Sequence, residues 1–447
     1  MTLTEIQRAL ESLEAKPLKS LGQNFLHDQN IARWIVSQGD IQPGDHVVEI
    51  GPGLGALSRL IQERCERLTL LEKDAAMARW LRESMQLPGV ELFHGDALDF
   101  DLRNLYGNGP VKVIGNLPYY ISSPLIAKFA SALSPASILV LMLQHEVAER
   151  MGATIGTPES GAMTVCTQRR WKVRYLRKVP ASCFFPAPKV ASAVVIMERK
   201  PASEVPPCDE ELFESLVRGG FSQRRKQLKN LLPQARENWS EICRTLDLPE
   251  TCRAEDLSLK QWVDFARILG GREAQRGQEM FDIVDESDRV MGQLPREEVH
   301  VNNLRHRAVH MLLFNKAGEI FLQKRSMWKD KNPFVWDSSA AGHVDAGETY
   351  EQAAVRELRE EIGATTSLTS LGKLPCSPQT GWEFIEVFFG QSEGPFSLDR
   401  LEVETGAFFP IDQVEAWTRQ SPRDFSSVFL LVLELWRKAG GASLLQS

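Results

Sequence analysis

Three glycines with the spacing of a ligand-binding turn follow a short apolar run near residue 50. The run covers residues 47–50 and is typical of a buried parallel strand, and a helical pattern begins near Ala56. Gly51, Gly53 and Gly55 stand between them. Glycine lets a backbone turn sharply and approach a ligand that a side chain would exclude. Because such a turn lies at the carboxyl end of its strand, it predicts a site for a nucleotide-like cofactor.

Carboxylates follow the next two expected strands. The strand at 67–71 is followed by Glu72, which lies 21 residues after Gly51. In nucleotide-binding α/β sheets, an acidic residue at about that distance accepts hydrogen bonds from the two ribose hydroxyls. The strand at 90–94 is followed by Asp96, whose carboxylate can accept a hydrogen bond from the exocyclic amine of an adenine ring. Both residues therefore extend the predicted cofactor site.

The motif N-L-P-Y at 116–119 follows the expected strand at 111–114 and suits the chemistry of an amine. An amine that attacks a methyl group must keep its lone pair free and directed at the donor. The side-chain oxygen of Asn116 and a backbone carbonyl fixed by Pro118 would hold its two N–H groups. Tyr119 offers a stacking face for a base lifted from its neighbours. The motif alone is compatible with an ordinary turn, but four successive strand ends with ligand-type residues favour a site.

Four cations lie within residues 224–229, in a part of the chain whose charges are otherwise balanced. A helical pattern, with apolar residues on its other side, is expected to carry them. A run of charges is usually a solvated helix face, but this density favours contact with the phosphates of a nucleic acid. The predicted RNA-binding residues are Arg224, Arg225, Lys226 and Lys229.

Residues 1–270 closely resemble the small-subunit ribosomal RNA adenine dimethyltransferase family, with the motifs in the right order and spacing. The resemblance implies a class I (Rossmann-like), doubly wound α/β methyltransferase core over 1–200 and a small all-helical rRNA-binding domain over 201–270. The motifs that carry it are G-Q-N-F-L at 22–26, E-I-G-P-G at 49–53, G-D-A at 95–97, N-L-P-Y at 116–119, F-F-P-A-P-K-V at 184–190 and Q-R-R-K at 223–226.

By this resemblance, the chain transfers two methyl groups from S-adenosylmethionine to the exocyclic amine of each of two adjacent adenosines near the 3′ end of small-subunit rRNA. Asn116 and Tyr119 would bind the target adenine, and Phe184 would stack on its other face. An activated methyl donor needs no strong general base, so catalysis would rest on positioning. A ribosome-assembly factor without catalysis is the alternative. The implied cofactor contacts are Asn24, Leu26, Gly51, Glu72, Asp96 and Asn116.

A second group of chemically active residues lies on a strong helical pattern at 349–362. Glu357, Glu360 and Glu361 stand at i, i+3 and i+4, so their carboxylates share one face within a single turn. Like charges this close repel each other unless a cation lies among them, and a divalent ion that bridges to pyrophosphate oxygens would meet that need. The glutamates alone are compatible with an acidic surface helix, but the glycines and Glu348 at set distances argue against it.

Residues 342–364 match the Nudix signature G-x5-E-x7-R-E-U-x-E-E-x-G-U, with Ala364 where a larger aliphatic residue is usual. The resemblance implies a Nudix α/β/α sandwich over 280–447. The chemistry that it implies is hydrolysis of a nucleoside-diphosphate-type small molecule with Mg²⁺ or Mn²⁺.

The resemblance also implies roles within this signature. Glu357 and Glu361 would be the main metal ligands, and Glu360 a further ligand or the group that activates water. Glu348 and Arg356 would pair to hold the loop against the helix.

Segments at 306–308, 322–326 and 336–339 resemble the Nudix branch that includes isopentenyl diphosphate isomerase. The isomerase needs a catalytic cysteine just before the histidine that corresponds to His343, where this chain has Ala340 and Ala341. Hydrolysis is therefore preferred to isomerisation. A binding or stabilising module with an idle hydrolase site is a further alternative.

The elements that must position these residues require more than one domain, because 447 residues are too many for one ordinary core. A polar, glycine-bearing stretch at 271–279 predicts a linker.

The net charge of −7 arises in the last third of the chain. Seven scattered cysteines without C-x-x-C spacing favour reduced thiols and argue against a zinc site or disulfide framework. We expect a cytoplasmic monomer without a signal peptide or membrane contact, because no apolar run approaches 18 residues.

Overall fold

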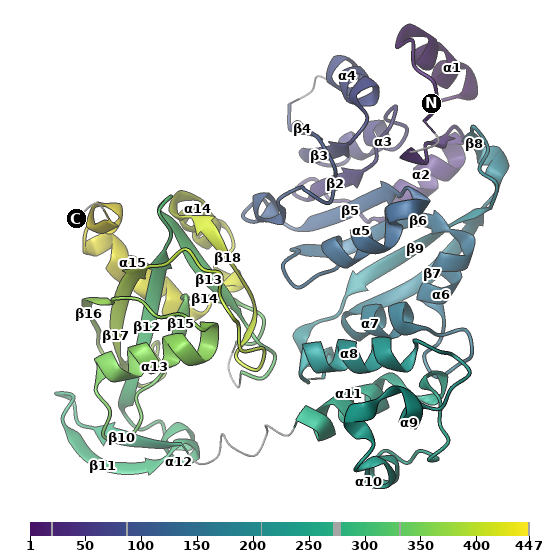
Figure 1. The fold of residues 1–447 in the computed structure, drawn as a ribbon. Helices are drawn as coiled ribbons and strands as arrows, with labels where there is room; N and C mark the ends of the chain where they lie inside the picture. The colour runs from purple at the N-terminus through teal and green to yellow at the C-terminus, as the bar shows by residue number, and fades with distance from the viewer. Residues whose placement is uncertain (19–20, 86–87, 207, 271–278, 330–331, 446–447) are drawn as a thin grey trace. The chain divides into compact units, whose positions relative to one another are not determined.

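The chain divides into two compact units (Figure 1). The first unit comprises Met1–Val205 with Glu214–Val263, and the second comprises Pro206–Phe213 with Asp264–Ser447. The predicted domain boundaries at residues 200 and 270 stay predictions. The predicted linker lies, apart from Glu279, outside the described residues. The computed structural model describes residues 1–447 except 19–20, 86–87, 207, 271–278, 330–331 and 446–447.

A seven-stranded sheet forms the centre of the first unit, in the order β4-β3-β2-β5-β6-β9-β7. Neighbours from β4 to β6 are parallel, and β9 is antiparallel to both β6 and β7. The strand order reverses between β2 and β5, so the carboxyl ends of these two strands flank the crevice where doubly wound sheets bind ligands. The strands are β2 (His46–Ile50), β3 (Arg67–Glu72), β4 (Val90–His94), β5 (Val111–Asn116), β6 (Ala136–Gln144), β7 (Trp171–Val179) and β9 (Ser192–Arg199).

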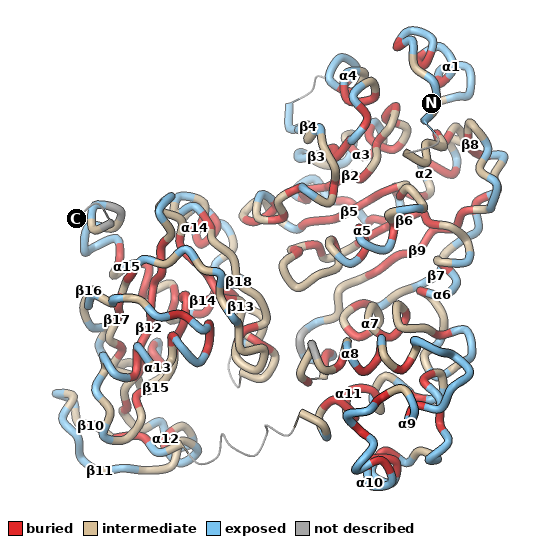
Figure 2. The backbone as a smooth tube through the Cα atoms, in the orientation of Figure 1, coloured by how far each residue is buried: buried red, intermediate tan, exposed pale blue. Residues whose placement is uncertain are grey.

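Apolar side chains fill both faces of this sheet, as a parallel sheet between helix layers requires. On β2, Val47 belongs to one buried cluster and Val48 to the other, because successive strand residues point to opposite faces. The central strands are accordingly buried along their length (Figure 2). Together with the strand order, this confirms the doubly wound fold class. The helices of this part are α1 (Leu3–Ser12), α2 (Gln29–Gln38), α3 (Ser58–Gln62), α4 (Ala75–Ser84), α5 (Ser122–Phe129), α6 (His145–Gly152) and α7 (Ala162–Arg170).

Helices dominate residues 210–270, but the prediction that one helix carries the four cations at 224–229 is wrong. The first helix of this part ends at Gly220, and residues 221–227 form turns, so that only Lys229 of the four predicted RNA-binding cations lies in a helix. Two consecutive glycines at 219–220 end the helix, since glycine favours helix termini over helix interiors. The helices are α8 (Glu210–Gly220), α9 (Leu228–Leu231), α10 (Trp239–Thr245) and α11 (Leu259–Gly270).

The second unit contains another seven-stranded sheet, in the order β14-β13-β12-β17-β16, with β15 paired to β12 and β18 paired to β13. The pair β12–β17 is parallel and the other pairs are antiparallel. The strands are β12 (His306–Phe314), β13 (Glu319–Arg325), β14 (Trp336–Asp337), β15 (Ala340–His343), β16 (Thr369–Leu374), β17 (Glu383–Gln391) and β18 (Val403–Pro410).

Helices cover both faces of this sheet, which confirms the α/β/α sandwich. Leu358 and Ile362 of α13 pack in one buried cluster with Val309 of β12, whereas Trp436 of α15 stacks on Phe314 from the other side. The N-cap of α13 is Thr349, whose hydroxyl accepts a hydrogen bond from the Gln352 N–H. The helices are α12 (Arg296–Val301), α13 (Tyr350–Ile362), α14 (Ile411–Gln420) and α15 (Ser427–Lys438), and a hairpin of β10 (Met280–Val284) and β11 (Val290–Pro295) precedes α12.

Among the described residues, no helix is both long enough and apolar enough to span a membrane.

Candidate active sites

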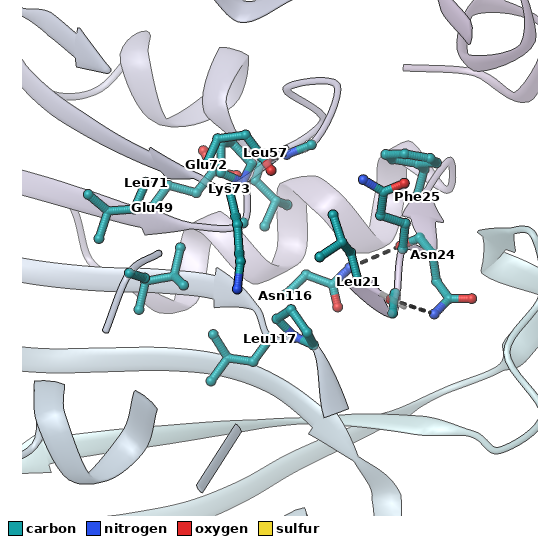
Figure 3. Close-up of a pocket in the computed structure, with 18 of the residues that line it drawn as sticks. Leu21, Asn24, Phe25, Glu49, Leu57, Leu71, Glu72, Lys73, Asn116 and Leu117 are labelled. Atoms are coloured by element: carbon teal, nitrogen blue, oxygen red, sulfur yellow. Dashed lines mark hydrogen bonds between the residues drawn. The ribbon is translucent and has the colours of Figure 1, made fainter. Parts of the chain in front are cut away.

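A cavity opens at the carboxyl ends of β2, β3 and β5, where the strand order reverses (Figure 3). Residues from separate segments meet at its wall. The segment before α2, the glycine turn, and the ends of three further strands all contribute. The cavity is lined by all six residues that the sequence predicts as cofactor contacts, Asn24, Leu26, Gly51, Glu72, Asp96 and Asn116.

The glycine turn follows β2 in a conformation that side chains disfavour. Gly51, Gly53 and Gly55 have φ values of 68°, 56° and 86°, which lie in the left-handed region. The Glu72 carboxylate accepts hydrogen bonds from the N–H groups of Gly53 at 3.0 Å and Asp74 at 2.8 Å. Burial raises the pKa of Glu72. This carboxylate therefore ties the end of β3 to the turn while it lines the cavity.

The Asn116 amide has its orientation set by a backbone carbonyl. Its side-chain Nδ2 donates to the carbonyl oxygen of Asn24 at 3.1 Å, and the Asn24 side chain in turn donates to the Gly22 carbonyl at 3.0 Å (Figure 3). The first bond uses the donor end of the Asn116 amide, so the oxygen end is the one presented as an acceptor.

The two predicted aromatic residues occupy different surroundings. Tyr119 lines the cavity, and its hydroxyl lies 2.7 Å from the Ser192 hydroxyl at the start of β9. Burial raises the pKa of the Tyr119 phenol. Phe184 is only 4% exposed, packs in an apolar cluster with Leu26 and Cys183, and is not among the residues that line the cavity. The structure thus brings together Asn116 and Tyr119 but not Phe184.

Two charged groups at the cavity were missed in the sequence. Lys73 forms an ion pair of 2.7 Å with Asp96 and lowers the pKa of that carboxyl. The available signal was the lysine that directly follows Glu72 at the end of the strand. Glu49, the residue before Ile50 on β2, is 2% exposed, and burial raises its pKa to about 8. An acidic residue inside an apolar run was the corresponding signal.

Replacing Glu49 with glutamine is expected to flatten the pH dependence of stability. The pKa of about 8 in the folded state lies above the ordinary value of 4.5, so the folded state binds the proton more tightly and loses stability as pH rises between these values. Between pH 6 and pH 9, the free energy of unfolding of the wild type should therefore fall by on the order of 2 kcal/mol relative to that of the variant. Urea unfolding at both pH values measures this, and parallel pH profiles would contradict it.

The predicted basic residues lie at the surface in the turn 221–227 and at the start of α9. All four side chains are exposed. The Arg224 guanidinium donates to the carbonyls of Pro158 at 3.2 Å and Ser160 at 3.0 Å, which fixes the turn against the segment before α7. The cationic cluster is thus exposed on a turn rather than on a helix face.

In the second unit, α13 carries the three predicted glutamates to unequal depths. Glu361 is 1% exposed and accepts hydrogen bonds from the Gln323 side chain at 3.0 Å and the Ala341 N–H at 2.9 Å. The Lys329 ammonium lies 2.9 Å from its other oxygen. By contrast, the Glu360 side chain is 59% exposed and reaches toward Arg356 at 3.2 Å. Glu361 is therefore the most deeply buried carboxylate of the three.

Glu357 is partly buried beside Glu361, with its side chain 14% exposed, and lies against the backbone of β15. A Cβ atom at Gly342 would overlap its carboxyl group, so the glycine at this signature position makes room for the glutamate. Burial and the neighbouring Glu361 charge raise the pKa of Glu357 to about 8. Neighbouring carboxylates that repel each other provide the hard oxygen ligands that a divalent cation favours, so the residues present fit Mg²⁺ or Mn²⁺.

Arg356 organises the loop before α13. It forms two hydrogen bonds with the Glu348 carboxylate, at 3.0 and 2.9 Å, which confirms the predicted pair. It also donates to Glu357 at 2.8 Å and to the carbonyl of His343 at 2.9 Å.

The sequence did not reveal Lys329, because its loop carries no recognisable motif.

Comparisons with known proteins match both parts of the chain. Residues 15–270 match a family model described as ribosomal RNA adenine dimethylase, and residues 304–429 match one described as NUDIX domain. The chain is 46% identical over 234 residues to ribosomal RNA small subunit methyltransferase A of Prosthecochloris aestuarii, covering 52% of this chain and 87% of the relative. The corresponding protein of Alkaliphilus metalliredigens is 37% identical over 265 residues, covering 57% and 92%. The crystal structure of a dimethyladenosine transferase from Plasmodium falciparum is similar with a TM-score of 0.47 and 24% identity, covering 55% of this chain and 97% of that one.

Proposed function

Because the chain belongs to the ribosomal RNA adenine dimethylase family, we propose that its first unit dimethylates the exocyclic amines of two adjacent adenosines near the 3′ end of small-subunit rRNA. S-adenosylmethionine supplies the activated methyl groups. The observation that carries the proposal is the convergence of Asn24, Glu72, Asp96 and Asn116, from separate segments, on one cavity at the strand-order reversal.

Different residues of the cavity hold the cofactor and the target base. The glycine turn leaves space beside the backbone, and Glu72 and Asp96 offer carboxylate acceptors for ribose hydroxyls and an adenine amine. The Asn116 oxygen accepts an N–H from the target amine, which directs the nitrogen lone pair toward the methyl group. Carbonyl oxygens around that nitrogen ease its transient positive charge.

The target base would stack on Tyr119, whose ring is steadied by the Ser192 hydroxyl. For Phe184 to reach the other face of the base, its ring has to leave the apolar cluster in which it is packed. The test is transfer of labelled methyl groups to small ribosomal subunits that lack them, with the product nucleoside identified by mass spectrometry. Dimethyladenosine at two adjacent positions is expected, and methyl groups at any other base would overturn the assignment.

Replacing Arg225 and Lys226 with alanine is expected to weaken binding to small-subunit rRNA about tenfold at moderate salt, because exposed cations on a turn bind phosphates by releasing counterions. The slope of log affinity against log salt should fall by about one to two. Filter binding over a salt series measures both quantities. The charge-matched control is the alanine double variant of Arg79 and Arg82, which are exposed on α4; equal losses in the two double variants would refute a role for the turn.

For the second unit we propose metal-dependent hydrolysis of a nucleoside-diphosphate-type substrate. Glu357 and Glu361 would hold Mg²⁺ or Mn²⁺, and Glu360 would be a further ligand or the group that activates water. The metal supplies charge neutralisation and a water of lowered pKa. The test is phosphate release by the full chain, with Mg²⁺, from a panel of nucleoside diphosphate derivatives.

One observation favours the alternative of an idle module. The Lys329 ammonium pairs with Glu361 and Glu402 and neutralises charge that a metal would otherwise neutralise. A measurement of Mg²⁺ binding discriminates hydrolysis from the idle module, because an idle site held by Lys329 would not take up the ion.

Isomerase activity is disfavoured, since Ala341 replaces the catalytic cysteine of the isomerase and Cys376 is the only cysteine after residue 252. The monomeric state and the cytoplasmic location stay predictions.

A further inference from the structure

Helix α1 contributes to the wall of the cofactor cavity, although no motif includes it. The motifs of the family resemblance begin at residue 22 and the family match begins at residue 15, so neither assigns a role to the helix. In the structure, however, Ile6 of α1 lines the cavity together with the predicted cofactor contacts. The first unit therefore closes its cavity partly with a segment for which the sequence predicted no function.

The helix has one apolar face, and that face is buried. Its buried residues recur at positions i, i+3 and i+4, so they share one side of the helix, whereas the polar residues between them are exposed. Thr2 is the N-cap and forms a capping box with Glu5. A helix of ten residues is marginal by itself, so it needs a partner surface for this face. The buried residues are Ile6, Ala9 and Leu10.

The partner surface of α1 is built from the segments that surround the cofactor cavity. One apolar cluster joins α1 to strand β1 (Phe25–Leu26), to the glycine turn and to α4. Phe25 directly follows the predicted cofactor contact Asn24, and Leu54 lies within the glycine turn. The helix thus packs on residues that adjoin predicted cofactor contacts. The buried members of the cluster are Ile6, Ala9, Leu10, Leu13, Phe25, Leu54 and Met77.

The packing continues from α1 through Phe25 to the glycine turn. A Cβ atom at Gly53 would lie only 3.1 Å from the Phe25 ring, so the glycine lets the ring lie directly against the turn. The N–H of Gly53 in turn donates to the Glu72 carboxylate at 3.0 Å. Because α1, Phe25, the turn and Glu72 are in contiguous contact, a ligand that orders the turn should also favour the docked position of α1.

We propose that α1 is part of the S-adenosylmethionine site, with Ile6 as a binding residue that contacts the ligand. The inference rests on the proposed use of S-adenosylmethionine by the first unit. Ligand pockets enclose most of their ligand with apolar side chains and orient it with a few polar groups. Glu72 and Asp96 are such polar groups here, and Ile6 adds an apolar wall that excludes water and slows release of the ligand.

The binding test uses S-adenosylmethionine and S-adenosylhomocysteine with the full chain, by calorimetry for affinity and stopped flow for dissociation. Ile6→Ala should raise the Kd about tenfold, chiefly through faster dissociation, because it removes apolar contact area from the wall. Ile6→Val, which removes one methylene and keeps the fold, should raise the Kd about threefold. The matched control is Gln7→Ala on the exposed side of the same helix, which should leave the Kd unchanged.

Amide hydrogen exchange provides a readout that does not depend on activity. Coupling between two binding events is reciprocal, so the ligand should stabilise the helix as much as the helix stabilises the ligand. S-adenosylhomocysteine should slow exchange across residues 3–12 about fivefold in the wild type, and by less in Ile6→Ala. Exchange in α10, in the helical part of the chain, should be unchanged by the ligand.

The outcomes separate a ligand-binding helix from a merely structural one. A structural helix would lower the melting temperature of Ile6→Ala equally with and without ligand, and would leave the Kd at the wild-type value. That result, or exchange in α1 that the ligand leaves unchanged, overturns the inference alone, since the wild type still binds. Failure of the wild type to bind either ligand would overturn the proposed methyl transfer and this inference together.

Discussion

Methyl transfer should fall at least 100-fold in kcat when Asn116 is replaced by alanine, while the affinity for rRNA stays within about twofold of the wild type. The Asn116 oxygen is the acceptor that would orient the target amine, and its amide is held by the Asn24 carbonyl. Loss of one such preorganised group typically costs 10²–10³ in kcat, or about 3–4 kcal/mol of transition-state stabilisation. Single-turnover transfer of labelled methyl groups to unmethylated small subunits measures the effect.

The control for this variant is Asn104→Ala, which removes an exposed asparagine elsewhere in the same unit. Full activity in both variants would show that the amine is oriented by other groups, and the site assignment would be wrong. Loss of both methyl transfer and RNA binding would instead indicate a folding defect, which the melting temperature would reveal. If the wild type bound rRNA but transferred no methyl group, the alternative of a factor without catalysis would hold.

Phosphate release by the second unit should fall at least 1,000-fold when Glu361 is replaced by glutamine. This carboxylate is buried on a rigid helix and oriented by the Gln323 side chain and the Ala341 N–H, so its charge is the least replaceable ligand for a divalent ion. Glutamine keeps the volume but removes the charge. Mg²⁺ affinity, followed by calorimetry, should fall in parallel with turnover.

The matched control is Glu351→Gln, because Glu351 is exposed in the first turn of the same helix. Its turnover should be unchanged. Turnover that survives in Glu361→Gln would place the metal elsewhere. A wild type that neither turns over any panel member nor binds Mg²⁺ would support the idle module, and one that binds Mg²⁺ without turnover would direct the search to other substrates.

Local sequence patterns determined most of the elements that carry these sites. The strand expected at 90–94 is β4 with the same bounds, and the strand expected at 67–71 is β3, one residue longer. The helix expected at 349–362 is α13 with Thr349 as its cap. These predictions succeed because apolar periodicity, glycine turns and capping residues act within a few residues of each other.

The basic segment at 224–229 shows where local reasoning failed. Apolar residues around the cations had helical spacing, but the consecutive glycines at 219–220 end α8 first. The exposed turn then depends on hydrogen bonds from Arg224 to carbonyls more than 60 positions earlier in the chain. The spacing of residues along the sequence does not predict such a distant partner.

The sequence by itself determined which residue types follow each strand, and hence that a methyl-transfer cavity and a metal-binding helix were to be expected. Only the tertiary structure decided that Phe184 packs in the core, that Lys73 pairs with Asp96 and that Lys329 reaches Glu361. It also brought together His300, His306 and His343, which are up to 43 positions apart in the sequence. The physical reason is that strand pairing and helix packing set these distances, and they act between segments whose separation along the chain carries no periodic signal.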